Sequence, residues 1–179
     1  TEVGQPGSIS SLADDWNSRF GIYSPSLQQG EAVPDFTGFA YTDAAGSWPS
    51  KFNAYPDFVN QRTANASYQG NASTGLNIKN NNTISTPAYL AANGADRRLA
   101  IVPVVDCSGF VSGSTAPVMS WGCVLMLHPL NQGGGSGTGS TRMYLEYRGS
   151  VSDPASPCAT MGGPGGPDSA GPRVPVLVQ

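Results

Sequence analysis

The single histidine, His128, is the first residue to consider for chemistry, because a Ser-His-Asp or Cys-His catalytic arrangement would have to use it. It ends an apolar run and directly precedes Pro129, where a structural role is normal for a histidine. No Gly-x-Ser-x-Gly nucleophile pattern precedes a predicted helix. The sequence therefore predicts no catalytic residue, and we expect a protein that is not an enzyme.

Carboxylates are few and scattered along the chain. Asp106 and Glu146 belong to neighbouring predicted strands and are the pair that could serve a glycosidase, but aspartates also recur in turns. No Asp-x-Asp-x-Asp-Gly calcium loop occurs. The glycine-rich run 133–139 lacks the Gly-Lys-Ser/Thr ending of a phosphate-binding loop, so its pattern is typical of a flexible hairpin tip. We expect no metal site and no cofactor.

The three cysteines, Cys107, Cys123 and Cys158, form no Cys-x-x-Cys pair, and with one histidine they do not make a zinc site of usual spacing. The simplest interpretation of three cysteines is one disulfide and one free thiol. Cys107 ends a predicted strand and Cys158 lies in a proline-rich loop that needs an anchor, which favours a Cys107–Cys158 bridge. A Cys107–Cys123 bridge is the alternative. Cys123 lies inside an apolar run, which suits a buried thiol.

Two features of residues 22–83 concern the binding of sugars or their attachment to the chain. Aromatic residues from Tyr23 to Phe58 recur at irregular spacing, which suits buried rings but also allows a platform for stacking on a sugar. Three Asn-x-Ser/Thr sequons follow, at Asn65, Asn71 and Asn81, in a segment rich in Asn, Ser, Thr and Gly. This composition predicts an exposed loop over residues 61–83.

The composition favours short strands and turns over long helices, since only 12% of residues are charged while glycine (23) and proline (15) are abundant. Two helices are expected, over residues 8–20 with the apolar stripe Leu12, Trp16 and Phe20, and over residues 87–92. Strands are expected over residues 99–106, 119–128, 141–149 and 173–179, with short ones near 36–42. We predict a mainly β (α+β) fold, a mainly antiparallel sheet or sandwich with long Gly/Pro-rich loops, as a single domain over residues 1–179.

The charge pattern argues against two classes of partner. The net charge is −3, and Arg97-Arg98 is the only adjacent basic pair, which predicts a solvated surface pair and no nucleic-acid footprint. No apolar run approaches the ~18 residues that a membrane span needs. Because the chain starts at Thr1 without an initiator methionine, we expect any export signal or membrane anchor to lie upstream. The low lysine content and frequent Ser, Thr, Asn and Gly favour an oxidising, extracytoplasmic compartment.

Three stretches of the second half carry a resemblance: RRLAIVPVVDCSGF from residue 97, SWGCVLMLHPL from residue 120 and RMYLEYRG from residue 142. Together with Pro6-Gly7 and the segment 19–21 (Arg-Phe-Gly), they resemble the C-terminal region of TadG-like proteins of the tight-adherence (Flp) pilus system. The resemblance places the family's leading arginine at Arg98, its Val-Asp-Cys element at 105–107 and its further landmarks at the positions Cys123, Gly149 and Cys158. The metal site that some members carry in a von Willebrand A-like domain has no match here.

The resemblance implies a non-catalytic structural or interaction module of a bacterial pilus-assembly system, in the periplasm or at the cell surface. Its expected partners are other pilus-assembly or pilin subunits, with no nucleic acid, and with the membrane reached only through an upstream anchor. Two alternatives remain. One is a secreted carbohydrate-binding or hydrolytic β domain, and the other is a self-assembling surface filament subunit that donates the terminal strand 173–179 to a neighbour.

Overall fold

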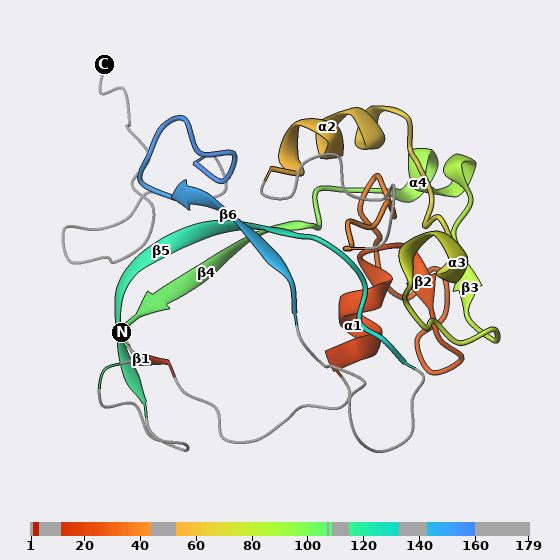
Figure 1. Ribbon diagram of the computed structural model, residues 1–179, viewed down its shortest axis with the longest axis horizontal. Helices are drawn as coiled ribbons and strands as arrows, with labels where there is room; N and C mark the ends of the chain where they lie inside the picture. Colours follow the sequence, from red (N-terminus) through yellow and green to blue (C-terminus); the bar gives the residue numbers. More distant parts are fainter. Residues whose placement is uncertain are drawn as a thin grey trace. The chain divides into compact units, whose positions relative to one another are not determined.

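The computed structural model describes residues 2–3, 12–43, 53–106, 108, 115–132 and 143–159. The strands form a four-stranded and a two-stranded sheet, with antiparallel pairing, and the helices are short (Figure 1). This confirms the predicted α+β class. None of the helices in the described part of the chain is long and apolar enough to cross a bilayer. The elements in chain order are β1 (Glu2–Val3), α1 (Leu12–Ser18), β2 (Ile22–Tyr23), α2 (Tyr55–Thr63), α3 (Asn71–Thr74), β3 (Thr83–Ile84), α4 (Pro87–Asn93), β4 (Leu99–Val105), β5 (Ala116–Met126) and β6 (Leu145–Ser150).

Contacts group the chain into two compact units whose segments alternate along the sequence. Unit 1 comprises the described parts of Thr1–Ile9, Leu99–Leu125 and Tyr147–Gln179, and unit 2 those of Ser10–Arg98 and Met126–Glu146. A single domain over residues 1–179 stays a prediction.

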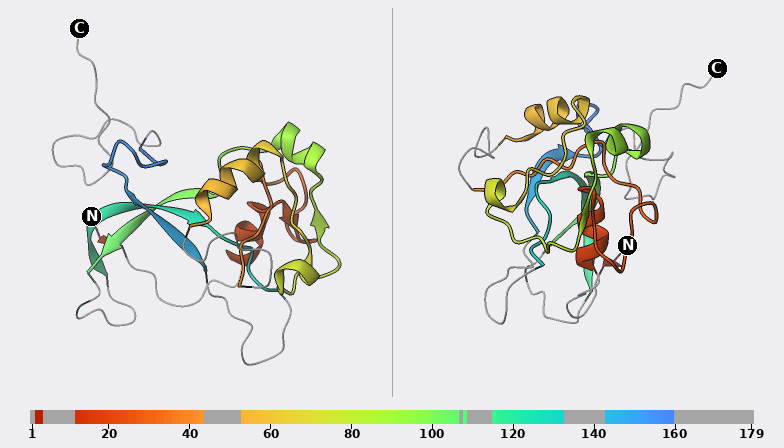
Figure 2. Two further views of the ribbon diagram at one scale, coloured as in Figure 1. Left: turned by 45° about the horizontal axis from the view of Figure 1, so that its top comes forward. Right: turned by 90° about the vertical axis from the view of Figure 1, so that its right-hand side faces the viewer.

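Unit 1 is built on the long pairing of β4 with β5, which are drawn as two adjoining curved ribbons in Figures 1 and 2. The register runs from Leu99 opposite Leu125 to Val105 opposite Val118, with an irregularity between Val104 and Val105. Both strands are rich in β-branched and apolar residues, as predicted, because such side chains pack well on a pleated surface. The short β1 pairs with the start of β5.

Pro103 lies within β4, at a position where the missing N–H costs no ladder hydrogen bond. Its partner across the ladder is Trp121, whose backbone carbonyl points the other way and accepts from the Val151 N–H at 3.1 Å. Because hydrogen bonding alternates along an antiparallel pair, Pro103 faces the outer edge of β4. Within the described residues β4 pairs only with β5, so Pro103 lies on an edge strand.

Unit 2 is held together around α1 and the two-stranded sheet. Helix α1 ends in a turn at Gly21, whose φ of +68° is a backbone conformation that favours glycine. A Cβ at this position would also lie 2.9 Å from the Cβ of Ser85, whose N–H donates to the Gly21 carbonyl. Gly21 therefore both terminates the α1 turn and lets β2 approach β3.

The core of unit 2 gathers side chains from α1, from β2, from the end of β5 and from the segments between β2 and β3. Its buried residues are Phe20, Ile22, Ala40, Tyr68, Ile78 and Met126, with Trp16 and Leu76 packed against them. Of the predicted stripe, Trp16 in α1 and Phe20, two residues beyond the end of the helix, lie in this cluster, while Leu12 is half-buried and is not part of it. Burial of such rings contributes the larger part of the stabilisation of a small unit.

Several local expectations differ from the structure. Residues 36–42 form no strand; instead the Gln69 side chain acts as a neighbouring strand would, accepting from the Ala40 N–H at 2.8 Å and donating to the Ala40 carbonyl at 2.9 Å. Residues 61–83, expected as loop, contain the end of α2, all of α3 and the start of β3. The helix predicted over 87–92 is confirmed as α4, with Thr86 as its N-cap. The predicted strand 173–179 lies outside the described residues.

Candidate functional site

His128 is a structural residue in the described part of the chain. Its ring is largely buried, with Nδ1 2.8 Å from the Pro129 carbonyl and with its centroid 4.7 Å from that of Tyr144. Because a carbonyl can only accept, Nδ1 carries the proton and donates. Burial lowers the pKa of His128 below its usual value, so the ring is neutral at pH 7. Its backbone carbonyl accepts from the Trp16 indole at 3.0 Å.

The two carboxylates considered for a glycosidase each have a local role. Asp106 is fully exposed and accepts from the Ser108 N–H at 2.8 Å, which lowers its pKa. Glu146 is buried and accepts from the N–H groups of Ala54 at 2.5 Å and Tyr55 at 3.3 Å, at the start of α2. A carboxylate at this position satisfies free N–H groups and interacts favourably with the helix dipole. Glu146 therefore caps α2 from a distant part of the chain.

Arg98 is the most connected polar side chain of unit 2, and it was predicted wrongly to lie on the surface. It is 0% exposed, while Arg97 beside it is exposed. A guanidinium has five N–H donors, and all five are used. Nε donates to Met126, Nη1 to Thr37 and Phe39, and Nη2 to Met126 and Leu127, always to the backbone carbonyl and at 2.7–3.3 Å. No donor is left for a ligand, so Arg98 serves the scaffold.

The charge of Arg98 is offset by neighbours rather than by solvent. The guanidinium carbon lies 4.2 Å from the Phe20 ring centroid and 4.9 Å from that of Phe58, within the range of a cation–π contact. Asp35 accepts from the backbone N–H groups of Arg97 and Arg98 at 2.9 and 3.0 Å. Burial lowers the pKa of Arg98 to about 10, and Asp35 opposes the shift, so the side chain stays charged at neutral pH.

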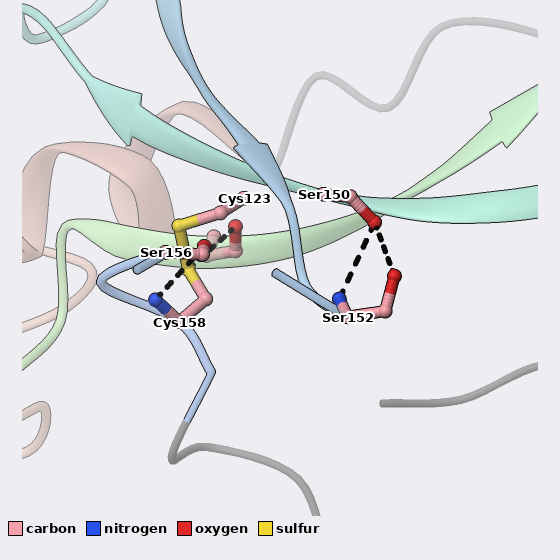
Figure 3. The surroundings of a disulfide bond; sticks show 6 residues. Cys123, Ser150, Ser152, Ser156 and Cys158 are labelled. Carbon is pink, nitrogen blue, oxygen red and sulfur yellow. Dashed lines mark hydrogen bonds between the residues drawn. A yellow bond between two sulfur atoms is a disulfide. The ribbon is translucent and has the colours of Figure 1, made fainter. Parts of the chain in front are cut away.

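The disulfide of the structure joins Cys123 to Cys158, which corrects the expected Cys107–Cys158 bridge, its Cys107–Cys123 alternative and the free Cys123 thiol. Three successive turns in residues 150–159 bring Cys158 back over β5, where Cys123 lies (Figure 3). Both cysteines are 0% exposed, and the sulfur of Cys158 lies 3.8 Å from the Ala100 carbonyl oxygen of β4. Cys107 lies outside the described residues.

In the described part of the aromatic segment considered as a sugar platform, three rings are buried and the others are half-buried. Tyr23, Tyr41 and Phe58 are at most 1% exposed, and the Tyr41 hydroxyl donates to Asp57 at 2.7 Å. Burial and that hydrogen bond raise the pKa of Tyr41. Of the sequon asparagines, Asn65 and Asn71 use their amides in hydrogen bonds to the backbone, while Asn81 is exposed.

One hollow in unit 2 was not foreseen from the sequence. It has a volume of about 410 Å³ and lies where β2 and β3 meet the loop that follows β2. Polar side chains from both sides line it, with no charged residue among them. The lining includes Tyr23, Ser24, Pro25, Gln28, Asn81 and Thr83. The described residues contain no group of three His, Cys, Asp or Glu side chains that could hold a metal ion.

Comparisons with known proteins add no relative to this description. No family model, no curated protein and no solved structure matches the chain.

Proposed function

We propose that this chain is a non-catalytic structural and interaction module of a bacterial tight-adherence (Flp) pilus-assembly system, located outside the cytoplasm. The proposal rests on the resemblance to TadG-like proteins and on where its landmark residues lie. Arg98 uses every donor inside unit 2, and Cys123 and Cys158 form the disulfide of unit 1. Gly149 has a φ of +101°, a conformation that other residues rarely adopt.

The observation that carries the proposal is that residues on which the resemblance rests are also residues that hold the fold together. Among the landmark residues in the described part of the chain, Arg98, Cys123, Gly149 and Cys158 fix the backbone or link segments, whereas Asp106 is an exposed carboxylate that accepts from the Ser108 N–H. A family defined by such residues keeps a shape rather than an active site. The disulfide also suits an oxidising compartment, which supports an extracytoplasmic location.

The exposed apolar side chains of unit 1 offer a surface for pilus-assembly or pilin subunits. Met119 of β5 is 68% exposed and Tyr147 of β6 is 61% exposed. The ring of Tyr147 lies against Gly122, where an added Cβ would meet it at 3.0 Å. Large exposed apolar side chains of this kind are common at protein interaction surfaces.

Within the filament alternative, the edge of β4 is a poor acceptor for a donated strand. A donated strand would need the outward N–H groups of an edge strand, and Pro103 lacks one at an outward position. Proline on an edge strand is a common protection against strand addition.

Deletion of the gene in its own bacterium tests the proposal, with surface pili counted by electron microscopy and adhesion measured. We expect both to fall, and both to return with the wild-type gene and with His128→Asn. A photo-crosslinking residue in place of Tyr147 should capture a pilus-assembly or pilin subunit, while one in place of the exposed Val33 of unit 2 serves as control. Unchanged pili and adhesion in the deletion strain would contradict the proposal.

A further inference from the structure

The hollow beside β2 and β3 has walls that are fixed by hydrogen bonds of the protein itself. On one side two consecutive turns are closed by Leu27 N–H to the Ser24 carbonyl at 3.1 Å and by Glu31 N–H to the Gln28 carbonyl at 3.0 Å. The Glu31 carboxylate also accepts from the Gln28 N–H at 2.6 Å. These bonds hold the backbone of the loop in place without using the side-chain amide of Gln28. The loop is therefore preorganised, and the Gln28 side chain is left for other partners.

The base and the opposite wall are fixed in the same way. Tyr23 is paired with Thr83 across the β2–β3 ladder, and its hydroxyl donates to the Ala32 carbonyl at 2.7 Å. The turn before β3 is closed by Asn82 N–H to the Lys79 carbonyl at 3.1 Å. The Asn82 amide is itself bonded to Gln132. Asn81 is thereby carried at the rim on a fixed turn.

The side chains that line the hollow are neutral hydrogen-bonding groups. Gln28, Asn81 and Thr83 are exposed, and no hydrogen bond from these side chains to another residue is present in the described part of the chain. A primary amide presents a donor and an acceptor side by side, and a hydroxyl can act as either. Pro25 adds an apolar surface to the lining. This set matches the alternating donors, acceptors and C–H faces of a polyol.

The same lining disfavours other classes of ligand. An anion such as a phosphate would need cationic side chains, which the lining lacks, and the net charge of the chain is −3. A divalent cation would need carboxylates, and none lines the hollow. A purely apolar ligand would leave the amides without partners, at a cost in free energy. The volume of about 410 Å³ lies within the range of ligand pockets in proteins.

We propose that this hollow binds an uncharged, hydroxyl-rich ligand, a neutral sugar unit of a glycan, through the side chains of Gln28, Asn81 and Thr83. The inference is independent of the pilus assignment, because it concerns one face of unit 2 and is tested on the purified chain.

Nuclear magnetic resonance of the ¹⁵N-labelled full chain provides the test. The probes are glucose, galactose, mannose, N-acetylglucosamine, cellobiose and lactose, each added up to about 10 mM, which suits ligands with a Kd of about 1 mM. We expect at least one of them to shift the amide signals of residues 23–29 and 81–83 in a saturable way. Glucuronate, a charged analogue, should bind more weakly, because the lining holds no cation.

Two variants and a matched control assign the binding to the hollow. Gln28→Ala and Asn81→Ala should each weaken binding about tenfold, which corresponds to about 1.4 kcal/mol. Asn60→Ala removes an equally exposed amide from α2, outside the hollow, and should leave binding unchanged. Because all three side chains are exposed, the variants should fold, and their spectra show whether they do. The proposal is overturned if no probe shifts these signals, or if both hollow variants bind as the wild type does.

Discussion

The sulfur of Cys123, in the second half of β5, is bonded to that of Cys158, in the segment after β6, across a sequence separation of 35 residues. Their Cα atoms lie 5.6 Å apart. The bond links the turns of residues 150–159 to the strand pair β4–β5 (Figure 3). It is the covalent cross-link of unit 1 in the described part of the chain.

The first prediction concerns this bond. Cys158→Ser should lower the free energy of unfolding by up to about 4 kcal/mol, because closing a loop of this length restricts the unfolded chain. Guanidinium denaturation under non-reducing conditions measures the loss, with Cys107→Ser as the matched control that leaves the bridge intact. A peptide map of protein from its native compartment should contain the linked Cys123–Cys158 pair. Recovery of a Cys107–Cys158 pair instead would contradict the structure.

The second prediction concerns Arg98. Arg98→Lys should lower the free energy of unfolding by about 3–5 kcal/mol, because a lysine cannot reach four carbonyls and leaves buried acceptors without donors. The neighbouring Arg97→Lys is the matched control, and because its side chain is exposed it should change stability by less than about 0.5 kcal/mol. Urea or guanidinium denaturation compares the two. Equal stability of the two variants would falsify the assignment of Arg98 to the scaffold.

The third prediction concerns the cap that Glu146 provides for α2. Glu146→Ala removes the acceptor of two helix N–H groups and should cost about 1–2 kcal/mol of stability. Glu31→Ala, which removes an exposed carboxylate bonded to one backbone N–H, should cost less. Hydrogen exchange at the first turn of α2 should accelerate in the Glu146 variant alone. Unaltered exchange there would show that the carboxylate is not the cap.

The fourth prediction concerns pH and His128. Its folded pKa is depressed, mainly by burial, and the nearby Arg98 charge acts in the same direction while the Pro129 hydrogen bond and Asp43 oppose it. The unfolded chain therefore binds a proton more readily than the folded one. The contribution of the neutral His128 ring to the free energy of unfolding is fully present above about pH 6.5, the pKa of an unfolded histidine. This contribution is lost as the pH falls through the folded pKa.

His128→Asn keeps a donor near the position of Nδ1 and removes the titration. We expect the wild type to lose more stability than this variant between about pH 7 and pH 5, a window set by the ordinary histidine pKa of about 6.5. Thermal unfolding across this range, with both proteins in the same buffers, measures the difference. Parallel curves for the two proteins would rule out a depressed histidine pKa.

Local sequence signals predicted an element correctly where the residues that define it lie within that element or next to it. Helix α4 has Thr86 as its cap and Pro87 in its first turn, and both lie next to the residues they organise. Strands β4 and β5 follow from continuous runs of apolar and β-branched residues.

Tertiary structure decided the features whose partners are distant in the sequence. The N-cap residue of α2, Ala54, makes no side-chain cap, and the helix start is capped by Glu146, about 90 residues away. Arg98 was expected in solvent because its four carbonyl partners lie in two separate segments, around residues 37–39 and 126–127. The disulfide follows from the turns after β6, which set where Cys158 returns.

The composition, cysteine content and strand runs thus determined by themselves that this chain forms a short-helix, antiparallel-sheet protein with a disulfide. Which cysteines pair, which arginine is buried and where a ligand-sized hollow forms were decided by the folded chain. The physical reason is that each depends on groups brought together from segments tens of residues apart, and the geometry of those approaches is set by the packing of the whole unit rather than by any local pattern.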